Sequence, residues 1–179
     1  TNFISLPGTP ANPSINAVIP ANAPINLVAT YDPTSTTPWL IATRNPQTGL
    51  FEGPLTTITA ERGYVVQATS FYTLQVLIPR AGFQQLPPSI PVFGGQWNLV
   101  PVVSAKDATD PTVQPGQTVD SDVYFGGLSV AAVFTFDTAQ AQFVKVVPDG
   151  SKTDNSTTDD LVFGRSYWVR PVNDGTIIP

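Results

Sequence analysis

Residues 39–52 read Trp-Leu-Ile-Ala-Thr-Arg-Asn-Pro-Gln-Thr-Gly-Leu-Phe-Glu, and this stretch decides the expected fold. Its first six residues favour a strand, because tryptophan, isoleucine and threonine fit a pleated, half-buried surface. Pro46 presets its own φ angle and Gly49 tolerates a positive φ, so the chain reverses direction between them. A second strand follows from Leu50. The stretch therefore predicts a β-hairpin.

Short strands bounded by proline, glycine, asparagine and aspartate continue along the rest of the chain. No long window shows the apolar spacing of an amphipathic helix without an intervening proline or glycine. The sequence therefore predicts an all-β protein with antiparallel sheets. The expected strands lie near residues 26–30, 39–44, 50–52, 55–59, 63–69, 72–78, 97–103, 122–125, 130–137, 142–147, 166–171 and 176–178.

Proline also indicates how the chain is divided. The first 24 residues contain five prolines among scattered apolar residues, which predicts an extended N-terminal arm. The run Leu-Pro-Pro-Ser-Ile-Pro at 86–91 is unsuited to the interior of a sheet and predicts a linker. The expected parts are an arm at 1–24, a first β-unit at 25–86, a linker at 87–94 and a second β-unit at 95–179. Each unit is expected to be a sandwich or barrel, and the second carries two loop insertions.

Three segments recur in the same order, which predicts an internal duplication. Ile25-Asn26-Leu27-Val28 matches Trp97-Asn98-Leu99-Val100, and residues 39–51 match residues 131–143 in their pattern of strand, turn and strand. Glu61-Arg62-Gly63-Tyr64-Val65-Val66 matches Gly164-Arg165-Ser166-Tyr167-Trp168-Val169.

The order of these segments resembles the duplicated β-repeats of secreted and cell-surface proteins of bacteria and archaea. Copies of those repeats often begin with Gly-Trp-Asn-Leu and end with Gly-x-Gly-Tyr-Trp-Val. The second copy here begins with Gly95-Gln96-Trp97-Asn98-Leu99-Val100, but Ser166 replaces a glycine near its end. In the first copy, Ile25 and Val65 stand where the repeats have tryptophan. The resemblance implies a small β-unit used for display and assembly, with no catalytic residues.

Composition excludes several classes of function. The 179 residues include no cysteine, histidine or methionine, which excludes disulfides, thiol or imidazole catalysis and zinc held by these ligands. The net charge is −5 and the eight lysines and arginines are scattered, so nucleic-acid and anionic-membrane binding are not expected. No apolar run is long enough to span a bilayer. Glu52 and Glu61 both lie beside turns, so no carboxylate pair is expected and the chain is not expected to be an enzyme.

The six apolar residues of the predicted arm are the candidates for assembly, because a disordered tail would contain fewer such residues. We expect them to pack along the chain's own domain or along a neighbouring copy. They are Phe3, Ile4, Leu6, Ile15, Val18 and Ile19.

The three tryptophans have two interpretations. Trp97 and Trp168 lie at equivalent strand positions of the repeat, flanked by apolar residues, which favours buried core anchors. The alternative is a platform on which sugar rings stack. It would be formed by Trp39, Trp97 and Trp168 with Tyr64, Tyr72, Tyr124 and Tyr167.

Aspartates gather in the two expected loop insertions. Asp107, Asp110, Asp120 and Asp122 lie in the first of them. Oxygen ligands on a flexible loop suit Ca²⁺, although the spacing does not match an EF-hand. Solvated acidic loops are the favoured interpretation and calcium the alternative, and no other cofactor is expected.

The expected function is a non-catalytic structural subunit that assembles on an outer surface through its arm and its sheet edges. A cell-surface layer, an extracellular filament or an adhesin would suit it, with partners that are further copies or neighbouring surface proteins in an oligomer or polymer. Two alternatives are a phage capsid or tail protein and a carbohydrate-binding module. The absence of residues that oxidise readily favours an extracellular or particle-surface location. Thr1 fits either a cleaved leader or a removed initiator methionine.

Overall fold

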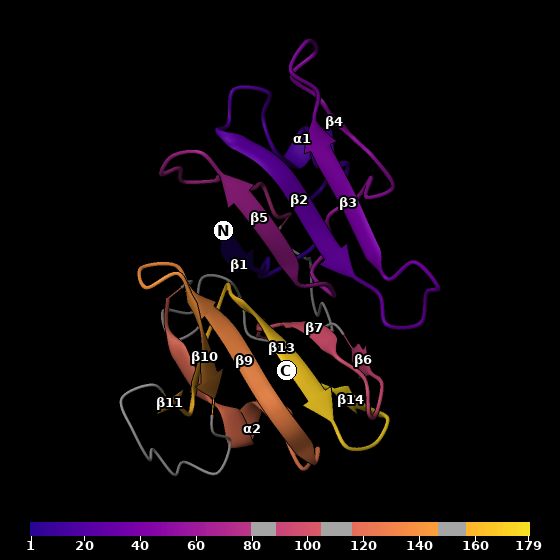
Figure 1. The fold of residues 1–179 in the computed structure, drawn as a ribbon, viewed down its shortest axis with the longest axis vertical. Helices are drawn as coiled ribbons and strands as arrows, with labels where there is room; N and C mark the ends of the chain where they lie inside the picture. The colour runs from indigo at the N-terminus through magenta and orange to yellow at the C-terminus, as the bar shows by residue number, and fades with distance from the viewer. Residues whose placement is uncertain (80–88, 105–115, 147–156) are drawn as a thin grey trace.

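The computed structural model describes residues 1–79, 89–104, 116–146 and 157–179 (Figure 1). Strands dominate these residues, which confirms the all-β prediction. The strand pairs are antiparallel except for β10 (Gln142–Val146) and β11 (Thr157–Thr158), which pair parallel. The hairpin expected at 39–52 is present, since Thr43 pairs with Glu52 and Arg44 with Phe51.

The first sheet has five antiparallel strands in the order β1-β5-β2-β3-β4. A short helix, α1 (Ile15–Val18), lies between β1 and β2 in the chain and buries Ile15 and Val18. The strands are β1 (Asn2–Ile4), β2 (Ile25–Tyr31), β3 (Trp39–Arg44), β4 (Phe51–Glu52) and β5 (Tyr64–Ala68).

The second sheet also has five strands, in the order β11-β10-β9-β13-β7. The strands are β7 (Asn98–Pro101), β9 (Val130–Asp137), β10 (Gln142–Val146), β11 (Thr157–Thr158) and β13 (Ser166–Pro171). The helix α2 (Ser121–Phe125) lies between β7 and β9 in the chain. Two small sheets pair β8 (Thr118–Asp120) with β12 (Asp160–Val162), and β6 (Ile90–Val92) with β14 (Gly175–Ile177).

The two large sheets share one strand order. The strands of each sheet can be numbered in chain order and read across the sheet from the first strand, which is β1 in one sheet and β7 in the other. Both sheets then have the order first, fifth, second, third, fourth. Both also have a helix that follows the first strand in the chain. The second strand is also irregular at the same place in each sheet. In β2 the pairing with β5 shifts between Ile25 and Leu27, and in β9 the pairing with β13 passes from Val130 to Ala132.

Each large sheet covers its own core with one face. In the first sheet Val28, Ala42 and Tyr64 are buried in this way, and in the second sheet Val133 and Tyr167 are buried. Both tyrosines accept a hydrogen bond from a backbone N–H five residues earlier, Tyr64 from Thr59 at 2.7 Å and Tyr167 from Val162 at 2.8 Å. Strand alternation sends the intervening residues to the outer faces.

The outer faces meet where the two sheets join. The Ser5 N–H donates to the Gly164 carbonyl at 2.9 Å, and the Ser166 hydroxyl donates to the Tyr64 carbonyl at 3.3 Å. Gly63 lies at this junction, where an added Cβ would stand 2.6 Å from the Cβ of Ser166. The two sheets are therefore joined by hydrogen bonds to main-chain carbonyls, and they approach so closely at Gly63 that a larger side chain has no room there.

The first 24 residues do not form the extended arm that the prolines predicted. Residues 2–4 form β1 and pair with β5, and residues 15–18 form α1. Five of the six predicted assembly residues are buried within the chain itself, and Ile4 packs against the first core. The buried five are Phe3, Leu6, Ile15, Val18 and Ile19. A three-residue strand gives too short a pattern to be recognised among prolines.

The matched segments occupy only partly equivalent places. Residues 61–66 and 164–169 reach β5 and β13, which hold the same position in their sheets. The other two matched pairs fall on strands at different positions; for example, β2 is third in its sheet, whereas β7 stands at an edge. Any apolar strand before a polar turn resembles any other, so these short matches did not fix the register of the repeat.

Some expected strands have another structure. Residues 122–125 belong to α2, which begins after Asp120, whose side chain accepts the Asp122 N–H at 2.8 Å. Residues 55–59 contribute one isolated bridge, and residues 72–78 belong to no strand. In the predicted linker at 87–94, Ile90–Val92 form β6, while residues 87 and 88 lie outside the described part.

Candidate functional site

The three tryptophans lie together at one open groove. A cavity of about 490 Å³ is lined entirely by aromatic side chains from both large sheets. We call it the aromatic groove; its lining residues are Tyr31, Trp39, Trp97, Phe134, Phe143 and Trp168. The groove unites all three residues of the predicted platform.

Strand pairing explains why these rings share one surface. Tyr31 of β2 pairs with Trp39 of β3, and Trp168 of β13 pairs with Phe134 of β9. Residues directly opposite in a sheet project from the same face. Trp168 lies on the outer face because its chain neighbours, Tyr167 and Val169, are buried in the second core.

The rings contact one another across the junction of the two sheets. The centroid of Trp168 lies 5.1 Å from that of Tyr31 and 5.7 Å from that of Trp39, with the rings nearly perpendicular. Trp97 lies 6.0 Å from Phe134 in a tilted arrangement. Edge-to-face contacts at these distances fix ring orientation, so the groove has a defined shape.

The groove is accessible to solvent. Trp39 is 41% exposed, Trp97 is 37% exposed and Phe143 is 57% exposed. The favoured interpretation of Trp97 and Trp168 as buried core anchors is therefore wrong for Trp97. Trp168 is half-buried and lines the groove from the outer face of β13 instead of filling the second core. The large buried anchors of the two cores are Tyr64 and Tyr167 instead.

Two cations share the outer face of the second sheet with the groove. Lys145 of β10 is exposed and pairs directly with Phe134. Arg170 follows Trp168 by two residues on β13, so both side chains project from the same face. The Arg170 Nε donates to the carbonyl of Gly95, two residues before Trp97, at 3.3 Å. No acidic residue is among those that line the groove in the described part of the chain.

The acidic residue that follows Tyr31 is compensated. Asp32 lies 3.7 Å from the Arg62 guanidinium and accepts a hydrogen bond of 2.6 Å from the Thr34 hydroxyl. The Thr34 hydrogen bond, with a smaller contribution from Arg62, lowers the pKa of the Asp32 carboxyl. Its negative charge therefore already has partners.

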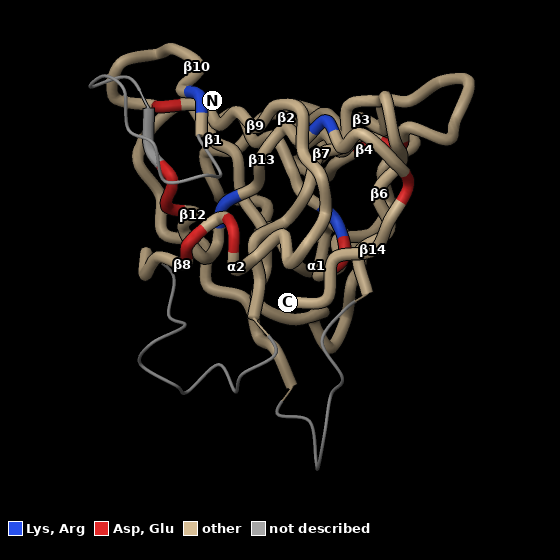
Figure 2. The backbone as a smooth tube through the Cα atoms, turned by 90° about the horizontal axis from the view of Figure 1, so that it is seen from below, with Lys and Arg blue, Asp and Glu red and all other residues tan. Residues whose placement is uncertain are grey.

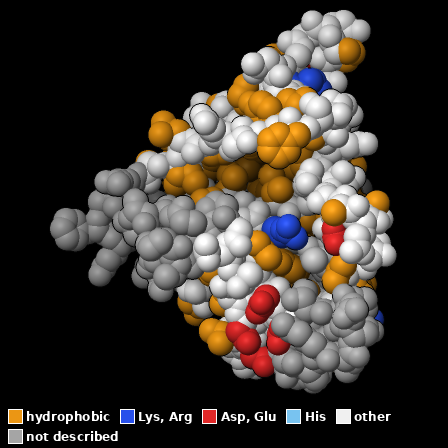
Figure 3. All heavy atoms as spheres, turned by 90° about the vertical axis from the view of Figure 1, so that its left-hand side faces the viewer, with side chains coloured by type: hydrophobic (Ala, Val, Ile, Leu, Met, Phe, Trp, Pro, Cys, Tyr) orange, Lys and Arg blue, Asp and Glu red, His pale blue; other side chains and the backbone are white. Residues whose placement is uncertain are grey.

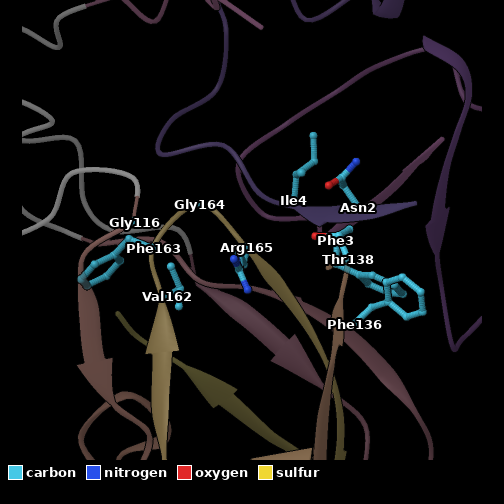
Figure 4. A pocket seen from close by; sticks show the side chains of 10 residues that line it. All are labelled: Asn2, Phe3, Ile4, Gly116, Phe136, Thr138, Val162, Phe163, Gly164 and Arg165. Carbon is cyan, nitrogen blue, oxygen red and sulfur yellow. The ribbon is translucent and has the colours of Figure 1, made fainter. Parts of the chain in front are cut away.

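A smaller pocket of about 280 Å³ lies beside β1 (Figure 4). Residues of β1 line it on one side, and Val162, Phe163 and Arg165 line it on the other. Arg165 is the only charged residue among its described lining residues, so the pocket has no carboxylate to work as an acid or base.

Burial raises the pKa of Tyr64, Tyr124 and Tyr167, which keeps these phenols neutral and inert near pH 7.

The acidic residues do not assemble a metal site among the described residues. Asp107 and Asp110 lie outside the described part, and Asp120 caps α2. Acidic residues do gather near β8 and α2 (Figure 2), but no described group of three or more acidic side chains is arranged to hold a metal ion. Calcium binding by Asp107, Asp110, Asp120 and Asp122, the alternative interpretation of these residues, stays a prediction.

Apolar surface is visible on the molecule at large scale. Figure 3 shows one face with hydrophobic side chains gathered in a hollow and acidic side chains below it.

No described helix is long and apolar enough to cross a membrane. No protein-family model, curated protein or solved structure matches the chain. The resemblance to surface β-repeats therefore remains a prediction.

Proposed function

We propose that the chain is a non-catalytic binding module whose aromatic groove holds a glycan. The observation that carries this proposal is the convergence of Trp39, Trp97 and Trp168 on one exposed groove. Sugar rings have a flat face of C–H groups that packs on an aromatic ring and a rim of hydroxyls that stays in water. An open groove with aromatic walls suits both requirements.

The volume of the groove and the charge beside it indicate which class of glycan it binds. Its volume of about 490 Å³ falls in the range of small-ligand sites, roughly 300–1,000 Å³, and accommodates a few sugar units. Lys145 and Arg170 lie on the same face as its rings, although the chain as a whole carries a net charge of −5. This local positive charge favours an acidic glycan, in which a carboxylate pairs with a cation while the ring stacks.

Glycan titration tests this function. We expect uronic-acid oligosaccharides to change the tryptophan fluorescence and to bind in calorimetry, more tightly than neutral oligosaccharides of the same length. Trp39→Ala should weaken binding by about tenfold, which corresponds to about 1.4 kcal/mol. Lys145→Gln should weaken binding of the acidic ligand alone.

The control is Ile178→Ala, which removes an exposed apolar side chain that does not line the groove. It should leave glycan binding unchanged. If no acidic or neutral glycan binds the native protein, the proposal fails.

A second candidate function is structural, as a self-assembling subunit of a cell-surface layer, filament, adhesin or virus particle. It is favoured by an extended apolar segment at residues 71–79, where Phe71 is 95% exposed and Leu77 is 80% exposed. Exposed apolar residues of this size are typical of contacts with other chains. Light scattering over a range of concentrations tests it, since a subunit of this kind should form oligomers.

We also infer that the two large sheets arose by duplication of one β-unit. The shared strand order, the shared helix after the first strand and the matching irregularities in β2 and β9 support this inference. In this arrangement β1 and α1 belong to the first unit.

A further inference from the structure

Residues 71–79 follow β5 and have the exposure pattern of a strand. From Thr73 onward the side chains alternate between exposed and half-buried, with Leu74, Val76 and Ile78 turned inward. Leu74 and Val76 pack against the first core. Ile78 packs against Gly8, where an added Cβ would lie 2.7 Å from the Ile78 side chain. We call these residues the unpaired segment.

Few of the described residues offer a hydrogen-bond partner to the backbone of the unpaired segment. Within the described part of the chain, its one backbone bond is from the Ala11 N–H to the Leu77 carbonyl, at 3.3 Å. Alternate residues of an extended chain direct their N–H and C=O groups to the same edge. The groups of Tyr72, Leu74 and Val76 therefore point to the edge opposite Ala11, where no described residue pairs with them.

From these observations we infer that the unpaired segment pairs with the same segment of a second copy. An edge with free backbone groups is a template for another strand, and pairing of this kind joins two chains through main-chain hydrogen bonds. This inference rests on the second candidate function, self-assembly, and identifies the surface that performs it.

The sequence of the segment is complementary to itself. In an antiparallel pair centred on Leu74, Phe71 of one copy lies across from Leu77 of the other, and Thr73 lies across from Gln75. The most exposed apolar residues of the segment therefore cover each other twice in one two-fold interface. Residues 69–78 contain no charged side chain, so two copies meet without repulsion.

Charge substitution at this pair tests the interface. The native protein should show a concentration-dependent dimer in sedimentation velocity. The double variant Phe71→Glu/Leu77→Glu places like charges opposite each other and should lose the dimer, as should Phe71→Lys/Leu77→Lys. An equimolar mixture of the two variants should recover a dimer, because opposite charges then face across the strands. Both positions are exposed, so each variant should remain folded by circular dichroism.

Cysteine pairing tests the register, since the native chain has no cysteine. Thr73→Cys mixed with Gln75→Cys should form a disulfide-linked dimer on mild oxidation, whereas either variant alone should form little. Val123→Glu, at an exposed position of α2, is the control and should leave the dimer intact.

The outcomes separate the interface from assembly itself. If the native protein and the charge variants dimerise equally, this interface is wrong and self-assembly stands. If the native protein is monomeric at every concentration, both are wrong.

Discussion

Tyr64 and Tyr167 show what a single residue contributes to this fold. Each is almost fully buried, and each hydroxyl accepts a backbone N–H five residues earlier in the chain. In both sheets the bond ties the strand that carries the tyrosine to the segment that precedes it in the chain. Tyrosine serves here because its ring fills the core while its hydroxyl satisfies a backbone donor that would otherwise be buried without a partner.

Tyr167→Phe should destabilise the protein although the ring is retained. The change leaves the Val162 N–H without its acceptor, and an unsatisfied buried donor costs about 1–3 kcal/mol. Urea unfolding followed by circular dichroism measures this loss as a lower midpoint with an unchanged slope. Tyr72→Phe, at a side chain that is 37% exposed and belongs to neither core, is the control and should leave the midpoint unchanged. An unaltered midpoint in Tyr167→Phe would contradict the role given to the hydroxyl.

At the scale of elements, the sequence predicted what local pattern determines. The hairpin at 39–52 was predictable because its turn has both a preset proline and a glycine at positive φ, which Gly49 adopts at 72°. β1 was not predictable, since three residues pair only because β5 lies beside them. The segment 122–125 has strand-forming residues, yet Asp120 caps it into a helical turn.

The three tryptophans of the aromatic groove were predictable as a group, but their exposure was not. Tyr167, Trp168 and Val169 are all apolar, so the sequence does not reveal which of them face the core. That choice depends on the phase of the strand, and a shift of one residue would exchange the two faces. The partners Phe134 and Phe143 had no signal of their own, because they meet the tryptophans only through sheet pairing and the junction of the two sheets.

Deletion of residues 1–24 should unfold the protein rather than release a monomer from an assembly. The deletion removes β1 and α1, and with them Leu6, Ile15 and Val18 from the first core. Loss of even one large buried side chain costs about 2–5 kcal/mol, against a typical total stability of about 5–15 kcal/mol. The measurement is the far-ultraviolet circular dichroism and melting curve of the truncated chain. A folded truncated protein would show that β1 and α1 are dispensable.

At the scale of the whole molecule, the two large sheets depend on each other. The ring centroid of Phe3 on β1 lies 5.9 Å from that of Phe136 and 6.0 Å from that of Phe143, both in the second sheet. Across the junction, Trp168 contacts Tyr31 and Trp39 of the first sheet. Both clusters lie on outer faces, so each sheet covers apolar surface that the other would leave exposed. The aromatic groove exists only while the two sheets remain together.

The sheets should therefore unfold in one transition. Tryptophan fluorescence reports on the groove and far-ultraviolet circular dichroism on the strands, and coincident urea curves are the sign of a single cooperative step. Phe3→Ala removes a buried ring from the junction, which should lower the free energy of unfolding by about 3–5 kcal/mol. Both midpoints should therefore fall together. Leu50→Ala, at an exposed position before β4, is the control and should change neither curve. Separate transitions in the native protein would mean that the two sheets unfold independently. The groove would then be lost with the less stable sheet, because its walls belong to both.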